Sequence, residues 1–297
     1  MKVGVLFNCQ SDGVAAALRA LLPGAEVINF TGGTVRQSPE RQAEVAAALH
    51  NCDHVISSGF DLRFGPLTGR VLRRAARRYH GVPAVTFTGF HPDMIYVPVE
   101  GSGPLTGPTG DYHSRIAVAG FLAGLTPAET AAMYNRLVFQ RLGYLALFAR
   151  QCALLTEYFA NMDIDAAPLL RGWLAGGSFM YSVNHPKMNV LLDLARTACT
   201  KMGVVPENAD VTAAELPDKL SAGPLHPVFP AVAAAAGVAP EGMFRNSKRP
   251  NGVYAELSPE AFAAASFAVY ETIPAAALHA ADGVAAALAA LGLLGAR

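Results

Sequence analysis

The sequence predicts an α/β fold, with a small parallel sheet embedded in a predominantly helical chain. Up to residue 88, short apolar runs rich in β-branched residues alternate with helical segments, which is typical of parallel strands joined by crossover helices. Beyond residue 115, helical patterns dominate and no internal repeat is present. We therefore expect a Rossmann-like or SGNH-like α/β part over residues 1–115 that carries the active site, and a mainly helical part over 116–297 packed with it as one unit.

Four short apolar runs predict the strands of the first part: residues 2–8, 27–30, 54–57 and 83–88. Between them lie three segments with helical character: residues 13–22, 39–50 and 66–80. Ser38 followed by Pro39 is typical of a helix start, because the serine caps the helix and the proline needs no N–H partner there. Gly81 is typical of a helix end. Alternation at this spacing indicates a parallel sheet with helices on both faces.

A loop rich in glycine and proline, residues 89–113, follows the last predicted strand. A loop of this length inside a compact domain is usually functional. Thr126, Pro127 and Glu129 form a capping box with proline at the first helical position, and we expect the helix that begins there to run past Tyr158. Further helical patterns follow at residues 187–202, 259–270 and 275–294.

Composition and charge narrow the class of protein. Hydrophobic residues make up 52% of the chain and charged residues 15%, which provides a core and excludes an intrinsically disordered protein. Lys plus Arg and Asp plus Glu number 23 each, so no global field attracts a nucleic acid. The four cysteines are widely spaced, the N-terminal apolar run is too short for a signal peptide, and the longest uncharged run contains prolines. We expect a cytoplasmic protein without a membrane span, as a monomer or a homo-oligomer.

Polar residues follow three of the predicted strands, where an open parallel sheet binds its ligands. Cys9 and its neighbours follow the first strand, Ser58 and Arg63 follow the third, and His91 and Asp93 follow the fourth. We expect these segments to converge at one edge of the sheet. A thiol, amides, hydroxyls, an imidazole and a carboxylate are the groups that nucleophilic or acid–base acyl chemistry requires.

Cys9 is the sharpest of these candidates. It stands between a strand and the start of a helix, where the helix dipole is expected to lower the pKa of a thiol. The alternative is a small buried residue, which is the usual fate of a free cysteine. The flanking amides of Asn8 and Gln10 favour a functional role, because buried amides need partners. For the other three cysteines, at 52, 152 and 199, the apolar helical context favours the core.

Three histidines stand in loops with polar neighbours: His91, His113 and His185. Each could order its loop or act as a general base, and we expect at least one to act. His226 has apolar surroundings and is not a candidate.

Phosphate-binding motifs are absent, since neither a P-loop nor a dinucleotide fingerprint occurs. Arg63 and Arg115 lie nearest the predicted site and are the phosphate candidates. Five further arginines share one predicted helix, where a solvated face is favoured over a local anion patch: residues 70, 73, 74, 77 and 78. Asp163 and Asp165 match the DxD pair of glycosyltransferases, but they follow a helix rather than a strand. No zinc-binding spacing occurs, and we expect no metal.

Several segments, in the same order along residues 1–205, resemble the acetyltransferases of bacterial capsular polysaccharide biosynthesis, a family that binds coenzyme A. They are NCQ at 8–10, GFHPDMIYV at 89–97, GDYHS at 110–114, LGYL at 142–145 and VNHPKMNVLLDLA at 183–195. The resemblance implies coenzyme A or acetyl-CoA as co-substrate, and O-acetylation of a sugar hydroxyl in a capsule or exopolysaccharide precursor. The positions shared with the family are Cys9, Gln10, His91, Asp93, Tyr112, His113, Ser114 and His185.

Together these observations give a hypothesis for the site. The catalytic candidates are Cys9, His91, Asp93, His113 and His185, and the candidates for binding the co-substrate are Gln10, Ser58, Arg63, Tyr112, Ser114 and Arg115. Either Cys9 carries the acetyl group as a thioester, or a histidine deprotonates the sugar hydroxyl for direct attack. Backbone N–H groups after Cys9, with the Gln10 amide, would stabilise the oxyanion.

Three alternatives stay open. The first is a GDSL-like esterase or deacetylase with Cys9 in place of the serine, although the DxxH of those enzymes is absent. The second is a glycosyltransferase that uses Asp163 and Asp165, and the third is a non-catalytic binding module.

Overall fold

Four parallel strands form a sheet near the N-terminus of the computed structural model. Their order is β2 (Glu26–Thr31), β1 (Lys2–Phe7), β3 (His54–Ser57) and β4 (Tyr79–Gly81). In the central strand β1, Val5 lies opposite Asn29 on one side and Ile56 on the other. The α/β fold class and three of the four predicted strands are confirmed. The structure describes residues 1–101, 103–246 and 255–293.

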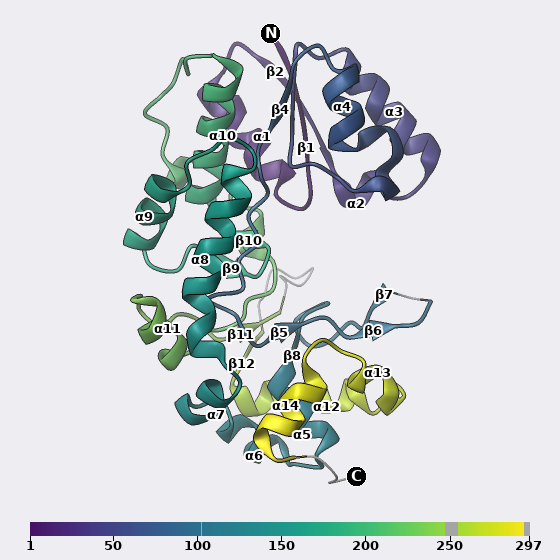
Figure 1. The fold of residues 1–297 in the computed structure, drawn as a ribbon, viewed down its shortest axis with the longest axis vertical. Helices are drawn as coiled ribbons and strands as arrows, with labels where there is room; N and C mark the ends of the chain where they lie inside the picture. The colour runs from purple at the N-terminus through teal and green to yellow at the C-terminus, as the bar shows by residue number, and fades with distance from the viewer. Residues whose placement is uncertain (102, 247–254, 294–297) are drawn as a thin grey trace. The chain divides into compact units, whose positions relative to one another are not determined.

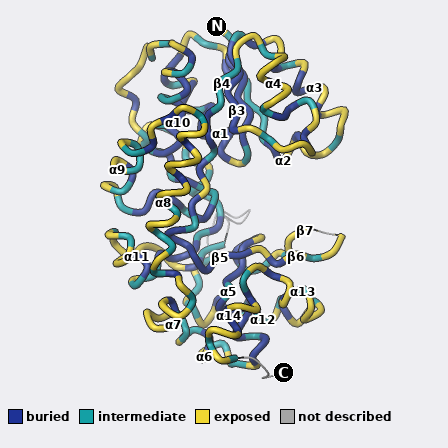
Figure 2. The backbone as a smooth tube through the Cα atoms, viewed as in Figure 1, coloured by how far each residue is buried: buried dark blue, intermediate teal, exposed yellow. Residues whose placement is uncertain are grey.

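Helices cover both faces of this sheet (Figure 1). On one face lie α3 (Pro39–His50) and α4 (Gly69–Ala75), and on the other lies α1 (Ser11–Leu21), backed by α10 (Met188–Met202). Gly4 of β1 permits the close approach of α3, because a Cβ there would come within 2.5 Å of the Leu49 side chain. The two central strands β1 and β3 are buried, whereas α3 and α4 each expose an outer face (Figure 2).

The fourth strand lies earlier in the chain than the sequence predicts. Residues 83–88 form no strand, and the segment predicted as one helix, 66–80, contains α4 followed by β4. The helix begins late because Thr68 caps it by accepting a hydrogen bond from the backbone N–H of Val71, and it ends early because Ala76 adopts an extended conformation (φ −72°, ψ 149°). β4 is an edge strand of three half-buried residues, so it lacks the apolar run by which the other strands are recognised.

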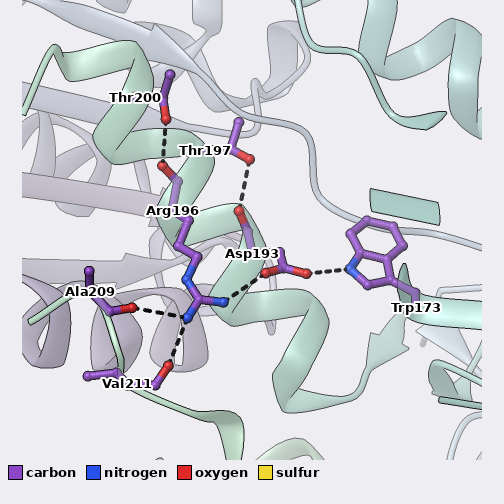
Figure 3. A network of polar contacts seen from close by, with 7 residues as sticks. All are labelled: Trp173, Asp193, Arg196, Thr197, Thr200, Ala209 and Val211. Carbon is purple, nitrogen blue, oxygen red and sulfur yellow. Dashed lines mark hydrogen bonds and ion pairs between the residues drawn. The ribbon is translucent and has the colours of Figure 1, made fainter. Parts of the chain in front are cut away.

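A polar network holds the loop after α10 and the short helix α9 (Ala167–Ala175) against α10 (Figure 3). The carboxylate of Asp193 accepts hydrogen bonds from Trp173 Nε1 at 2.9 Å and from Arg196 at 3.2 Å. The Arg196 guanidinium also donates to the carbonyl oxygen of Val211 at 2.8 Å. This network is structural, since its donors and acceptors satisfy one another.

Helices and short hairpins make up the rest of the described chain. The predicted loop 89–113 contains two hairpins, in which β5 (Met94–Ile95) pairs with β8 (His113–Ser114) and β6 (Pro98–Val99) with β7 (Gly103–Pro104). A core of apolar residues gathers α5 (Arg115–Leu122), α12 (Pro259–Tyr270) and their neighbours, with Phe244 and Phe262 stacked at 3.8 Å between ring centroids. This part also contains α11 (Pro230–Ala236), β11 (Phe244–Arg245) and β12 (Glu256–Leu257).

Two predicted helices are interrupted. The helix that begins after Thr126 is divided into α6 (Pro127–Ala132), α7 (Arg136–Arg141) and α8 (Tyr144–Ala160). Asn135 caps α7 and Gly143 adopts a left-handed conformation (φ 74°) before α8, so each break has a local cause. The last predicted helix is divided into α13 (Ala275–His279) and α14 (Val284–Leu291), with Gly283 at φ 70° between them. The helices predicted at 187–202 and 259–270 are confirmed.

The residues group into two compact units by the density of their internal contacts. The first unit comprises Met1–Thr86, Leu154–Phe179 and Asn184–Ser221, and the second comprises Phe87–Ala153, Met180–Val183 and Ala222–Arg297. The organisation into residues 1–115 and 116–297 stays a prediction. No helix within the described ranges has both the length and the apolar character that crossing a membrane requires.

Candidate active site

Cys9 lies in the first unit, two residues after the end of β1 and just before Gln10, the N-cap residue of α1. It is exposed, and its thiol contacts the carbonyl oxygen of Asn184 at 3.7 Å. Loss of hydration nevertheless raises the pKa of the thiol to about 11, and a backbone hydrogen bond opposes this shift only in part. The expectation that the helix dipole lowers this pKa is therefore wrong. At neutral pH the resting group is the thiol, and a base is needed to make it a nucleophile.

The completely buried side chain of Gln10 ties two other segments to the strand end. Its Nε2 donates to the carbonyl oxygens of Val85 at 2.8 Å and Asn184 at 3.0 Å, and its Oε1 accepts from the Val85 N–H at 3.0 Å. The backbone N–H of Gln10 in turn donates to Asn8 Oδ1 at 3.0 Å. Both amide hydrogens of Gln10 are engaged, so the geometry contradicts its predicted role as an oxyanion donor. The side chain instead positions the backbone around Cys9.

His185 follows Asn184, the residue that contacts both Cys9 and Gln10. It lies half-buried in β10 (His185–Pro186), and burial lowers its pKa, so that the imidazole is neutral at pH 7. Of the three candidate histidines, it is the one in the same unit as Cys9.

Two further candidates of the first unit have partners. Ser58 is buried, and its carbonyl oxygen accepts a hydrogen bond from the Tyr158 hydroxyl at 3.5 Å. Arg63 is exposed and forms an ion pair with Asp61 at 2.6 Å. A phosphate would have to compete with that carboxylate, which is also exposed.

Asp93 is the centre of a buried network in the second unit. Its carboxylate accepts hydrogen bonds from the hydroxyl of Ser114, from the hydroxyl of Tyr144 at 2.8 Å and from the backbone N–H of Ile116 at 3.0 Å. The Ser114 oxygen caps α5 and lies 2.7 Å from the hydroxyl of Tyr134. Burial raises the pKa of Asp93, and the hydrogen bonds from Ser114 and Tyr144 oppose that shift.

Arg115, at the start of α5, has its donors engaged within the second unit. Its guanidinium donates to the carbonyl oxygens of Asp282 at 3.0 Å and Pro92 at 3.3 Å, and to the Tyr144 hydroxyl at 3.2 Å. It also lies 5.7 Å from the centroid of the Tyr144 ring. These contacts give Arg115 a clamping role beside Asp93, and its predicted phosphate binding stays a prediction.

His113 is completely buried, with hydrogen bonds to both ring nitrogens. Nε2 lies 2.9 Å from the carbonyl oxygen of Leu105, and Nδ1 lies 3.1 Å from the hydroxyl of Tyr270. Because a carbonyl only accepts, Nε2 carries the hydrogen and Nδ1 accepts from the tyrosine. The ring also packs against Gly107, where a Cβ would come within 2.6 Å of it. This geometry is that of a residue that orders its loop, and Tyr112 beside it is buried as well.

His91 is buried and lines a small cavity of about 10 Å³, together with Asp93, Tyr144 and His226. That volume holds about one water molecule. Sequence reasoning missed Tyr134 and set aside His226, whose Nε2 lies 3.0 Å from the hydroxyl of Thr109. No local sequence pattern could have paired His226 with Thr109, because the two residues lie 117 positions apart in the chain. Tyr144 falls within the LGYL motif, and its hydroxyl contacts both Asp93 and Arg115.

The acidic pair Asp163 and Asp165 follows α8, and its use by a glycosyltransferase stays a prediction. Asp165 accepts a hydrogen bond from the N–H of Ala167 at 2.9 Å at the start of α9, and Asp163 occupies a left-handed backbone conformation at φ 56°. In the part of the chain that the structure describes, no three His, Cys, Asp or Glu side chains gather as ligands for a metal ion.

The candidate residues thus form two groups. Cys9, Gln10, Ser58, Arg63 and His185 belong to the first unit. The second unit holds His91, Asp93, Tyr112, His113, Ser114 and Arg115. Convergence of both groups at one edge stays a prediction.

Comparisons with known proteins give the family and the fold of this chain. The family described as polysaccharide biosynthesis enzyme WcbI matches residues 2–207. The chain is also similar to a solved structure of WcbI, described as a novel polysaccharide biosynthesis enzyme and as the native protein without a disulfide bond between coenzyme A and one of its cysteines. The two share 15% identity over 98% of each chain with a TM-score of 0.76, which establishes a common fold. No curated protein matches the chain. Since the family match covers well over half of the residues, this chain belongs to the WcbI family of polysaccharide biosynthesis enzymes.

Proposed function

We propose that this protein is an O-acetyltransferase that uses acetyl-CoA to acetylate a sugar hydroxyl of a capsule or exopolysaccharide precursor. One observation carries the proposal: an exposed thiol, Cys9, stands between the carboxyl end of β1 and the start of α1. The solved structure of WcbI is described as the native protein without the disulfide bond between coenzyme A and a cysteine, and that description pairs the same two groups, coenzyme A and a cysteine thiol. A thiol that can meet the sulfur end of coenzyme A is also placed to meet its acetyl group.

The raised pKa of Cys9 requires a general base, and we assign that role to His185. The neutral imidazole would take the thiol proton as the sulfur attacks the thioester carbonyl, giving acetyl-Cys9. The departing thiolate of coenzyme A would receive that proton. In the second half, His185 would take a proton from the sugar hydroxyl as the hydroxyl oxygen attacks acetyl-Cys9, and the cysteine sulfur would leave and be reprotonated.

The start of α1 supports the oxyanion in this proposal. No side chain caps this helix, and the Ser11 N–H donates to the Asn8 carbonyl oxygen at 3.2 Å. The N–H groups of Asp12 and Gly13, at the positive end of the helix dipole, are therefore the proposed oxyanion donors. Such donors stabilise negative charge that develops on a carbonyl oxygen. Arg63 is the proposed contact for a phosphate of coenzyme A, exchanging its exposed partner Asp61 for the ligand.

Acetyl transfer is tested with purified protein, labelled acetyl-CoA and a panel of sugar acceptors. Cys9→Ala and Cys9→Ser are compared with wild type. Loss of transfer in both variants, with an acetyl adduct on the wild-type protein when acceptor is omitted, supports the covalent route. Full activity in both removes that route and leaves direct attack by the sugar. Hydrolysis of a simple acetyl ester at the same rate with or without coenzyme A would favour an esterase instead.

A further inference from the structure

A polar recess lies along the edge strand β4 in the first unit, outside the residues assigned to acetyl transfer. Its volume is about 480 Å³, within the range of about 300–1,000 Å³ that is usual for small-molecule sites. Arg73 of α4, His80 of β4 and Lys201 of α10 line it, with Asn161 and Asp163 from the segment after α8. β3 separates β4 from β1, so β4 runs about 10 Å, or two strand spacings, from the strand that leads to Cys9.

Two cations in this recess have no carboxylate partner among the described residues. The guanidinium of Arg73 lies 5.3 Å from the ring centroid of Tyr79 and forms no ion pair there. The ammonium of Lys201 donates one hydrogen to the carbonyl oxygen of Met162 at 2.6 Å, which leaves two of its three hydrogens for a ligand. Asp163 contributes the one carboxylate of the lining. The recess therefore has an excess of positive charge and of donors.

A chain of hydrogen bonds through two histidine rings holds these groups in place. Arg78 lies 3.2 Å from His54 Nε2, and His54 Nδ1 lies 3.0 Å from His80 Nε2. Because arginine only donates, the hydrogen of His54 is on Nδ1 and points to His80, and the other nitrogen of His80 carries a hydrogen. That ring bonds to the backbone of Lys201, which ties α10 to β4. Burial, with the charges of His54, Lys201 and Arg78, lowers the pKa of His80, as expected where positive charge gathers.

We propose that this recess binds the phosphate group of a phosphate monoester that also carries hydroxyl groups, such as a sugar phosphate or the phosphorylated ribose of coenzyme A. The planar guanidinium of Arg73 suits two phosphate oxygens at once, and the ammonium of Lys201 adds a charge-assisted hydrogen bond. The Asp163 carboxylate and the Asn161 amide suit hydroxyl groups beside the phosphate. The negative charge of Asp163 repels bare inorganic phosphate. Hydroxyl groups of an attached sugar can donate to this carboxylate, so the sugar decides which phosphate esters bind.

Calorimetric titration of the full-length protein tests the site with three probes: a hexose 1-phosphate, adenosine 3′,5′-bisphosphate and inorganic phosphate. The variants are Arg73→Gln and Lys201→Gln. Arg74→Gln is the matched control, because Arg74 is exposed in the same turn of α4 and does not line the recess. We expect at least one organic phosphate to bind the wild-type protein. R73Q and K201Q should each raise its Kd about tenfold, and R74Q should leave the Kd unchanged. Circular dichroism establishes that each variant is folded.

Comparison of coenzyme A with dephospho-coenzyme A separates the two sources of the phosphate. If coenzyme A binds wild type more tightly and the difference disappears in R73Q and K201Q, the phosphate is that of coenzyme A. If R73Q and K201Q weaken the binding of the hexose phosphate alone, the phosphate is that of a second substrate. No binding of any organic phosphate, or equal affinities in R73Q, K201Q and R74Q, would overturn the proposal. Failure of the acetyl-CoA proposal looks different, since wild type would then bind neither form of coenzyme A.

Discussion

Gln10 and Val85 exchange two hydrogen bonds, at 2.8 and 3.0 Å, in which a side-chain amide pairs with backbone as a neighbouring strand would. The pairing ties the backbone at Val85 to the residue that follows the end of β1 by three positions, although residues 83–88 form no strand. It also explains why an amide side chain stands next to Cys9, because Nε2 of Gln10 donates to the carbonyl oxygen of Asn184 as well. Gln10 thus joins the end of β1 to the backbone at Val85 and at Asn184, the residue that precedes His185.

Replacing Gln10 with alanine should therefore destabilise the protein. The change leaves buried polar groups of Val85 and Asn184 without their partner, and each such group costs about 1–3 kcal/mol. We expect a loss of about 2–4 kcal/mol in the free energy of unfolding, measured by urea denaturation. Asn51→Ala, which removes an exposed amide at the end of α3, is the control. A loss below about 0.5 kcal/mol, as is usual for surface changes, would contradict the assigned role.

The thiol of Cys9 should react slowly in the free protein. A pKa of about 11 instead of 9.0 leaves about 100-fold less thiolate at neutral pH. We expect alkylation by iodoacetamide, followed by peptide mass spectrometry, to be slow at pH 7 and to rise about tenfold per pH unit through pH 9. Cys9→Ala identifies the Cys9 peptide against the half-buried Cys152. Fast labelling that is flat above pH 7 would mean that the thiolate already exists at rest.

Acetyl-CoA should stabilise the folded protein if it is the co-substrate. A ligand at about 100 times its Kd adds about 2.7 kcal/mol, which for a chain of this size raises the Tm by roughly 5–10 °C. The measurement is a thermal shift with acetyl-CoA, with ATP as the control for a phosphate-rich ligand. An absent shift at millimolar coenzyme A would contradict the proposed function, and an equal shift with ATP would mean that the acyl end is not recognised.

Because of Asp93, the free energy of unfolding should decrease as the pH rises above about 4. Burial raises its folded-state pKa above the unfolded value, so the folded state binds more protons between the two values. Stability from this group is fully present below the unfolded pKa and is lost as pH rises through the folded pKa. We expect the difference in unfolding free energy between wild type and Asp93→Asn to decrease from pH 4 to pH 7.

Tyr144→Phe provides a second variant for the same network, should Asp93→Asn fold poorly. It removes a hydrogen bond at 2.8 Å to the Asp93 carboxylate, which stabilises the charged form. The folded-state pKa of Asp93 should rise further, and the loss of stability should extend to higher pH than in wild type. Parallel profiles for Tyr144→Phe and wild type would mean that Asp93 does not titrate in this range.

His226 should make stability fall in acid. Burial and the nearby His91 and His113 hold its pKa well below the usual value. Its contribution is present above the unfolded pKa of about 6.5 and is lost as pH falls, by up to about 1.4 kcal/mol per pH unit. His226→Gln keeps a donor for the Thr109 hydroxyl, whose own hydrogen goes to the Tyr112 carbonyl, and it cannot titrate. Its unfolding free energy should therefore change less between pH 7 and pH 5. An equally steep profile in this variant would assign the acid sensitivity to other histidines.

Local patterns of residues determined most of the secondary structure. Ser38 and Pro39 start α3, and the apolar run at β1 reads as a strand, because capping and hydrophobic periodicity act over a few neighbours. The NCQ, HPD and DYHS segments likewise indicated the family, and the place of Cys9 between a strand and a helix was predicted from the sequence. That Cys9 is exposed comes from the structure.

Tertiary structure decided what those residues do. The pKa of Cys9 is set by desolvation, and the amide of Gln10 is engaged by Val85 and Asn184, 75 and 174 positions away. His113 orders a loop because Tyr270, 157 positions on, bonds to its ring. The recess at β4 exists because three separate elements bring Arg73, His80 and Lys201 together. A side chain's residue type sets which bonds it can make, but only the folded chain decides which partners reach it and how much water remains around it.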